Sequence, residues 1–205
     1  MENKNQKEVW NNIAEEWHEF RVKSNVKQGK HVEEFLKNKK GKILDLGSGS
    51  GNHLRNIKEG KMYLVDFSEK MISLAKEKAN QENIEAEFFV SDVTNLPFED
   101  NFFDYSIVES SLHCLNKKKQ KETVKELFRV LKPKGKAEIS VWNKNSKRFK
   151  NSDKEKYIGW RDKGKRYYYL STPDEVYNLF ENQGFEITSK EENPNRMIIF
   201  TVKKP

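Results

Sequence analysis

The stretch from Lys42 to Gly51, with the sequence KILDLGSGSG, is the strongest clue to the fold of this chain. It begins as a short apolar run, which predicts a buried strand, and it ends with glycines at every second position. The residues that follow, Asn52–Ile57, are expected to open a helix. A strand, a glycine turn and a helix form the first unit of a nucleotide-binding α/β fold, because glycines let the backbone pass close under a ligand.

The spacing of these glycines and the acid before them indicate the charge of the ligand. Dinucleotide-binding proteins carry the pattern G-x-G-x-x-G and place a pyrophosphate at the start of the helix. Here the pattern is G-x-G-x-G, and Asp45 lies two residues before the first glycine. A carboxylate repels a pyrophosphate and attracts an amine or a sulfonium, so a dinucleotide is disfavoured. The alternative is a glycine-rich surface turn without a ligand.

A second signal, KMYLVDFS at Lys61–Ser68, favours a ligand site over a surface turn. It is another apolar run that ends in an acid, Asp66, which follows Asp45 by 21 residues. In nucleotide-binding folds, an acid at about this distance and at the end of the second strand binds ribose hydroxyls. For Asp66 considered alone, the alternative is a structural role as a turn residue at the end of the strand. Ser68 is expected to cap the helix that follows.

Together the two signals resemble the class I S-adenosylmethionine-dependent methyltransferases, whose motif I has the form D-x-G-x-G-x-G after a strand. The resemblance extends from Glu8 to Lys203. It implies S-adenosylmethionine as the cofactor. It also implies a Rossmann-like α/β fold, in which helices cover both faces of a seven-stranded, mostly parallel sheet with an antiparallel last strand. The cofactor-binding residues that it implies are Asp45, Gly47, Gly49, Gly51, Asp66, Phe67, Asp92, Val93 and Glu109.

Two of these residues follow the third predicted strand, Ile84–Val90. In the family, an acid at the position of Asp92 binds the adenine amino group, and the next residue, here Val93, often packs on the adenine ring. Later in the chain, Lys136–Trp142 is predicted as the fifth strand, and the segments 185–188 and 197–202 are predicted as a closing antiparallel hairpin.

The fourth predicted strand, Phe103–Val108, leads to Glu109 and to two residues with reactive side chains. His113 is a candidate catalytic residue, and a purely structural role in the wall of the cleft is the alternative. Cys114 is not expected to act as a nucleophile, because no neighbouring residue would activate its thiol.

A chain of 205 residues is expected to form one domain, residues 1–205. Within it, residues 8–38 are expected to form an N-terminal helical lid, and residues 143–170 a basic, aromatic insertion before the last helix. The apolar residues of Glu8–Phe20 recur at helical spacing, so this helix either packs on the sheet or closes over the cofactor as the resemblance implies. His31 is expected on the surface of a second helix.

Several classes of protein are disfavoured by composition. No apolar run approaches the roughly 18 residues of a membrane span, and the N-terminal residues are polar. The chain has one cysteine, which excludes an internal disulfide and a cysteine-rich zinc site. The sequence therefore predicts a cytoplasmic protein without a metal site or a membrane partner.

The positive charge of the chain is concentrated in the insertion. Residues 143–170 contain ten basic and three acidic residues, an excess that equals the net charge of +7 for the whole chain. Cations and aromatic rings suit RNA, because they bind phosphates and stack on exposed bases. The alternative is a solvated lysine-rich loop whose aromatics only anchor it. The aromatic residues of the insertion are Phe149, Tyr157, Trp160, Tyr167, Tyr168 and Tyr169.

A closer resemblance specifies the partner. The segments VWNKNSKRF and GWRDKGKRYYYLSTPDEV are similar to those of the tRNA wobble-uridine methyltransferases, which esterify a 5-carboxymethyl group. The resemblance implies tRNA as the substrate and a small zinc-binding activator protein that covers an apolar edge near the third strand, such as Phe88–Val90. Ordinary sheet core is the alternative role for that edge. The substrate-binding residues expected from this resemblance are Trp17, Arg21, Arg161, Arg166 and Tyr168.

The expected chemistry needs no general base. A carboxylate acceptor is already ionised at neutral pH, so positioning supplies much of the catalysis. Two other functions remain open at this point. One is a methyltransferase for a small molecule such as a quinone or a sterol-like acceptor, and the other is a non-catalytic RNA-binding protein that keeps the fold.

Overall fold

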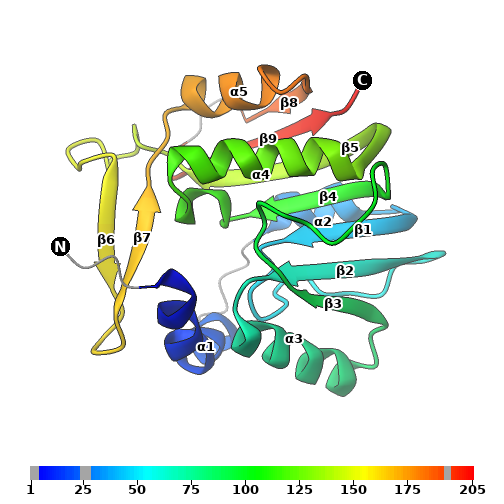
Figure 1. Ribbon diagram of the computed structural model, residues 1–205, viewed down its shortest axis with the longest axis horizontal. Helices are drawn as coiled ribbons and strands as arrows, with labels where there is room; N and C mark the ends of the chain where they lie inside the picture. The colour runs from blue at the N-terminus through cyan, green and yellow to red at the C-terminus, as the bar shows by residue number, and fades with distance from the viewer. Residues whose placement is uncertain (1–4, 24–28, 192–194) are drawn as a thin grey trace.

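The computed structural model describes residues 5–23, 29–191 and 195–205, and it has a seven-stranded sheet at its centre (Figure 1). The strand order is β3-β2-β1-β4-β5-β9-β8, and β9 runs antiparallel to its neighbours β5 and β8. The predicted sheet is therefore confirmed. In chain order the elements are α1 Gln6–Lys23, α2 Lys30–Leu36, β1 Gly41–Leu46, β2 Gly60–Asp66, α3 Glu69–Glu82, β3 Ala86–Val90, β4 Phe103–Glu109, η1 Leu112–Cys114, α4 Lys117–Val130, β5 Leu131–Trp142, β6 Glu155–Gly159, β7 Lys165–Tyr169, α5 Pro173–Glu181, β8 Glu186–Lys190 and β9 Met197–Lys203.

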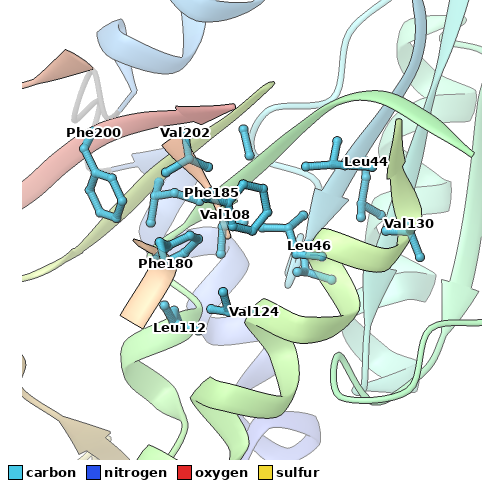
Figure 2. Packing of buried hydrophobic residues seen from close by; sticks show 14 of the residues in the cluster. Leu44, Leu46, Val108, Leu112, Val124, Val130, Phe180, Phe185, Phe200 and Val202 are labelled. Atoms are coloured by element: carbon cyan, nitrogen blue, oxygen red, sulfur yellow. The ribbon is translucent and has the colours of Figure 1, made fainter. Parts of the chain in front are cut away.

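The two faces of the sheet bury different side chains, because successive residues of a strand point to opposite faces. Leu44 and Leu46 of β1 belong to the core that α4 and α5 cover, and Figure 2 shows this packing from close by. Ile43 of β1 and Met62 of β2 belong to a second core, which α2 and α3 complete. Helices therefore cover both faces of the sheet, as predicted.

The helix expected at Asn52–Ile57 is absent from the structure, so this prediction was wrong. The chain forms turns after Gly47 and then runs to β2 without a helix. Since Gly60 pairs with Gly41, the connection must return along the whole length of β1. The thirteen residues of this connection, 47–59, make the return as turns and irregular chain.

Other boundaries differ from prediction by a few residues. Helix α4 begins at Lys117, where the side chain of Asn116 caps it by accepting a hydrogen bond from the Lys119 amide at 3.0 Å. Helix α1 extends beyond the predicted Glu8–Phe20 at both ends.

The basic insertion folds into turns followed by the β6–β7 hairpin, which forms a sheet of its own. The hairpin lies beside α1 at the carboxyl ends of the main parallel strands (Figure 1). The Tyr167 amide donates to the side-chain oxygen of Gln6 at 2.8 Å, and the ring centroids of Trp17 and Trp160 are 5.0 Å apart. These contacts place the insertion and the N-terminal helix on the same side of the sheet.

Candidate functional site

A pocket of about 820 Å³ opens at the carboxyl ends of β1, β2, β3 and β4, the place where ligands of such sheets bind. Helix α1, the β6–β7 hairpin and the start of α4 complete its walls. Most of the predicted site residues line it, namely Trp17, Arg21, Asp45, Gly47, Gly49, Asp66, Phe67, Asp92, Val93 and Glu109. The predicted residues that lie outside its walls are Gly51, His113, Arg161, Arg166 and Tyr168.

Asp45, at the end of β1, is the most deeply buried acid of the pocket, with 1% of its surface exposed. Its Oδ2 atom has no hydrogen-bond partner among the described residues. Burial, together with the negative charges of Asp66 and Glu109, raises the pKa of Asp45 to about 8. Because an unpaired buried carboxylate is costly, a cationic group of a ligand would stabilise this position.

The glycine loop after Asp45 does not offer its amides to an anion. The amides of Gly47 and Ser48 donate to the Val65 carbonyl at 2.8 and 3.0 Å, and the Gly51 amide donates to the Ser48 carbonyl. The Gly49 amide donates to the Asp66 carboxylate at 2.9 Å. With these amides occupied and no helix after the loop, the loop lacks the phosphate-binding device of dinucleotide-binding folds.

Two glycines of the loop are required by its geometry. Gly47 has φ +77°, and a Cβ atom there would lie 2.3 Å from the Cβ of Ser111. Gly49 has φ +53°, and a Cβ atom there would meet nothing within 4 Å, so this part of the loop borders open space. Gly51 lies behind the wall, where its carbonyl accepts a hydrogen bond from Lys78 Nζ at 2.9 Å.

Asp66 is held at the end of β2 by main-chain donors. Its carboxylate accepts hydrogen bonds from the amides of Gly49 and Ser68, each at 2.9 Å. Burial raises the pKa of Asp66 to about 6, although these donors and the Phe67 amide act in the opposite direction. The carboxylate is therefore fixed in position against the pocket, where the predicted ribose contact requires it.

Glu109, at the end of β4, forms an ion pair that the sequence did not predict. Its Oε2 lies 2.9 Å from Nε2 of His31, a residue that was expected on the helix surface. Burial alone would raise the pKa of Glu109, but the hydrogen bond from His31 and its charge keep it below its ordinary value. Glu109 in turn raises the pKa of His31 despite the opposing effect of burial. Spacing along the chain gives no signal of this pair.

Asp92 lies at the rim of the pocket, after β3. Its Oδ1 accepts hydrogen bonds from the amide and the hydroxyl of Thr94, and its Oδ2 lies 3.0 Å from Lys119 Nζ. Burial raises the pKa of Asp92, but these donors outweigh it and the net shift is downward. The predicted adenine contact at this position therefore involves a carboxylate that already has partners.

His113 is packed behind the pocket, away from its surface. Its ring stacks on Trp142 with the centroids 4.8 Å apart, and its Nδ1 accepts a hydrogen bond from the Trp142 amide at 3.2 Å. Burial lowers the pKa of His113 to about 3, so its ring is neutral. Tyr168 also stacks on Trp142, with the ring centroids 4.5 Å apart, and is 2% exposed. This placement corrects the proposed catalytic role of His113 and the proposed substrate contact of Tyr168.

Two of the three arginines predicted to bind substrate, Arg161 and Arg166, also lie outside the pocket wall. Arg166 is buried among aromatic rings, with its Cζ 4.9 Å from the centroid of Trp17 and 5.1 Å from that of Trp160. Arg161 is exposed and pairs with Glu16 at 2.7 Å. Arg166 therefore supports the aromatic wall formed by α1 and the hairpin, and Arg161 fastens the hairpin to α1.

The alternation of side chains along the hairpin explains this result. Tyr157 and Tyr167 face each other across β6 and β7, so they share one face of the hairpin, and both line the pocket together with Glu155. Arg166 and Tyr168 point to the other face, where α1 and Trp142 pack. The residues of the pocket face were not predicted as site residues, although their period-two spacing marks them as one set.

The aromatic residues of the insertion are mostly used for packing. Phe149, Tyr167, Tyr168 and Tyr169 are buried, whereas Tyr157 is 48% exposed. The buried rings are not available to stack on bases, which corrects the expectation for the group. Tyr157 has an exposed ring on the pocket face.

Lysines at the start of α4 also line the pocket and were not predicted. Lys117, Lys118 and Lys119 line the pocket and occupy the first turn of the helix, which contains no acid. The helix dipole disfavours positive charges at a helix N-terminus. Three lysines in the first turn therefore run against helix stability, and this is the signal in the sequence that could have identified them as functional residues.

Comparison with known proteins agrees with this geometry. Residues 43–135 match the family model described as a methyltransferase domain. The demethylmenaquinone methyltransferase of Thermotoga maritima is 31% identical in an alignment over 178 residues. The alignment covers 77% of this chain and 75% of that protein. The ubiquinone/menaquinone biosynthesis C-methyltransferase UbiE of Laribacter hongkongensis is 31% identical over 108 residues, which are 50% of this chain and 43% of that protein.

Solved structures share the fold at lower identity. The 1,6-didemethyltoxoflavin-N1-methyltransferase of Burkholderia thailandensis was solved with bound 1,6-didemethyltoxoflavin and S-adenosylhomocysteine. It has a TM-score of 0.70 at 17% identity, and the match covers 96% of this chain and 87% of that chain. A chain of the complex between the Haloferax volcanii Trm112 methyltransferase activator and a methyltransferase has a TM-score of 0.70 at 16% identity, over 94% of this chain and 97% of its own.

Fold, pocket and relatives together define a methyltransferase. The chain belongs to the class I S-adenosylmethionine-dependent family, and S-adenosylmethionine is its cofactor. The pocket fits that molecule for two reasons. The unpartnered oxygen of Asp45 suits a cationic group, and the loop amides already donate to acceptors within the chain, as expected for a ligand without a phosphate. In residues 5–23, 29–191 and 195–205, no helix is long and apolar enough to cross a membrane, and no cluster of metal-ligating side chains is found.

Proposed function

We propose that the protein methylates tRNA and that the acceptor is a carboxymethyl group on the wobble uridine, which becomes a methyl ester. The observation that carries this proposal is the position of the basic insertion. The segment with an excess of seven positive charges contributes Glu155, Tyr157 and Tyr167 to the pocket wall, and three lysines at the start of α4 also line the pocket. A positively charged segment beside the pocket suits an acceptor that is attached to a polyanion.

Residues at the carboxyl ends of β1, β2 and β3, here called the cofactor half of the pocket, would hold S-adenosylmethionine. The bound cofactor would supply a methyl group carried on a sulfonium. Asp45 would bind the positively charged end, and Asp66 the ribose hydroxyls. Asp92 and Val93 would lie at the adenine ring, with Phe67 in the same wall of the pocket. These roles follow from strand-end position and from the family resemblance.

His113 and Cys114 are not suited to take a proton from the acceptor. Burial lowers the pKa of His113 to about 3 and raises that of the Cys114 thiol to about 12. A carboxylate acceptor has no proton to lose at neutral pH, so it fits these surroundings. Arg21, a partly buried guanidinium in the pocket wall, is the proposed contact for its negative charge.

A second candidate function is methylation of a small molecule such as a quinone. The names of the curated relatives favour it, because the Thermotoga and Laribacter proteins are quinone-pathway methyltransferases. A prenylated quinone needs an apolar channel, however, and the pocket rim here includes Gln6, Glu155 and Lys117–Lys119. The polar and charged side chains of this rim favour the tRNA acceptor.

A protein partner is part of the proposal. The outer strand of the sheet at one edge is β3, where Val90 is 46% exposed and Phe88 is partly buried. We infer that a small zinc-binding activator covers this edge. The neighbour from Haloferax volcanii was solved with a methyltransferase activator, and an unpaired strand with apolar side chains is a suitable template for such a partner.

The test is transfer of labelled methyl groups from S-adenosylmethionine to tRNA that contains carboxymethyluridine, with and without the candidate activator. Label that enters the tRNA and is released by mild alkali is the expected result, because methyl esters hydrolyse under those conditions. A demethylmenaquinone analogue serves as the competing acceptor. Labelling of the quinone analogue with none of the tRNA would overturn the proposal in favour of the second candidate.

A further inference from the structure

The ring of Tyr157 is exposed at a place where packing does not require it. Tyr157 lies on the pocket face of the β6–β7 hairpin and is 48% exposed, although its neighbours Tyr167 and Tyr169 are buried. Burying an aromatic ring is favourable by about 25 cal/mol per Å² of apolar surface, so an exposed ring in a pocket wall is a candidate contact for a ligand.

The hairpin holds this ring in a defined orientation. Tyr157 pairs with Tyr167 in the ladder, and their ring centroids are 5.4 Å apart with the planes at 68°. This edge-on contact fixes the ring on one side and leaves about half of the residue open to the pocket. A preorganised ring loses little conformational freedom when a planar ligand stacks on it.

Of the three lysines at the start of α4, Lys118 has the longest ion pair. Lys119 lies 3.0 Å from Asp92, and Lys117 lies 3.6 Å from Glu175. The side chain of Lys118 is 85% exposed, and its ion pair with Glu122 is 4.0 Å long. An exposed pair of that length is weak, so Lys118 keeps its charge available for an anion at the pocket mouth.

We propose that Tyr157 and Lys118 form an RNA subsite at the mouth of the pocket, where the Tyr157 ring stacks on a nucleobase and Lys118 binds a phosphate of the same strand. This inference rests on the proposed tRNA acceptor and deepens it by naming the contacts. Stacking on aromatic rings combined with phosphate neutralisation is how unpaired RNA is bound. A quinone offers a ring for stacking but no phosphate for Lys118.

The experiment measures the affinity of the full chain for an anticodon stem-loop that carries carboxymethyluridine. Tyr157→Ala is expected to weaken binding by about 5- to 150-fold, the range of one base stacked on an aromatic residue. Tyr157→Phe keeps the ring and is expected to bind within about twofold of the wild type, since the stacking contact is retained. The affinity for S-adenosylhomocysteine is measured in parallel and is expected to stay unchanged in both variants.

Lys118→Ala tests the phosphate contact through its salt dependence. Removing one phosphate contact on single-stranded RNA is expected to reduce the slope of log affinity against log salt by about 0.7. Lys125→Ala is the matched control, because Lys125 is an exposed lysine of the same helix that does not line the pocket. It is expected to leave the slope unchanged.

The outcomes separate this inference from the proposed function. If the wild type methylates tRNA but Tyr157→Ala and Lys118→Ala bind and respond to salt as the wild type does, the subsite is overturned and the function stands. If the wild type methylates only a small molecule, both fall together. A large loss for Tyr157→Ala that Tyr157→Phe does not share, with a smaller salt slope for Lys118→Ala alone, supports the subsite.

Discussion

The pocket has a proposed cofactor half and a proposed acceptor half, and they are built in different ways. In the cofactor half, the functional side chains stand at the ends of neighbouring parallel strands, and main-chain amides such as those of Gly49 and Ser68 hold them. In the acceptor half, the walls come from α1, the β6–β7 hairpin and the start of α4. Side-chain contacts such as those of Gln6 and Glu16 hold these elements together. Substitutions in the cofactor half are therefore expected to have the larger effects.

Gly47→Val is expected to have the largest effect on the cofactor half. A side chain there combines a left-handed backbone with a contact of 2.3 Å to Ser111, so we expect a loss of about 3 kcal/mol or more in the free energy of unfolding. Urea denaturation measures the loss. Gly159→Ala in the hairpin is the control, because a Cβ there meets nothing within 4 Å, and its stability should match the wild type or exceed it slightly. Equal losses in both variants would contradict the comparison.

Asp66→Ala sharpens the separation between the halves. The variant loses a charged acceptor at the proposed ribose position, so we expect cofactor affinity to fall by about 10- to 100-fold. Affinity for tRNA is expected to stay within about twofold, because Asp66 is a strand-end residue of the other half. Calorimetry with S-adenosylhomocysteine and filter binding with tRNA measure the two quantities. Similar losses of both affinities would disprove the division.

Cofactor affinity is expected to rise with pH between about 6 and 8. The pKa of Asp45 is about 8 in the cofactor-free protein, and a cationic ligand favours its ionised form, so binding releases a proton. The effect is at most about tenfold per pH unit for one group. Calorimetry in two buffers with different ionisation enthalpies counts the released protons. Asp45→Asn should remove this release, and an unchanged proton count in that variant would refute the assignment.

The same shift has the opposite sign for the stability of the cofactor-free protein. Folded Asp45 holds a proton that the unfolded chain releases above its ordinary pKa of 3.8. The contribution of this group to stability is therefore present below about pH 4 and is lost as the pH rises towards 8. Asp45→Asn should be less sensitive to pH than the wild type over this range in urea denaturation.

Ser50→Ala is expected to have the smallest effect of this series. It removes the contact of 2.9 Å between Ser50 Oγ and His18 Nδ1, which joins the glycine loop to α1. We expect a loss of about 1 kcal/mol in the free energy of unfolding, since one neutral hydrogen bond is removed. Thermal and urea denaturation measure the loss, and a value above about 3 kcal/mol would show that the contact between the halves carries more than this bond.

The sequence predicted the cofactor half better than the acceptor half for physical reasons. Asp45 and Asp66 end apolar strands, and parallel strands bring their carboxyl ends to one edge, so local pattern was sufficient. The segment Asn52–Ile57 forms turns and irregular chain, and its local pattern did not distinguish these from the expected helix. Of the hairpin residues, Arg166 and Tyr168 were chosen from the face that packs inward, because alternation gives two faces and does not say which one meets the pocket.

Helix α1 has a consequence for how the two ligands influence each other. Through Asn11 it bonds to Ser68 and Glu69 beside the cofactor half, and through Glu16 it bonds to the acceptor-half hairpin. A single helix thus forms part of both proposed binding surfaces. A ligand that favours one position of α1 in one half would favour it in the other, which would couple the two affinities thermodynamically. By reciprocity, the factor by which bound cofactor would tighten the proposed RNA binding equals the factor by which RNA would tighten cofactor binding.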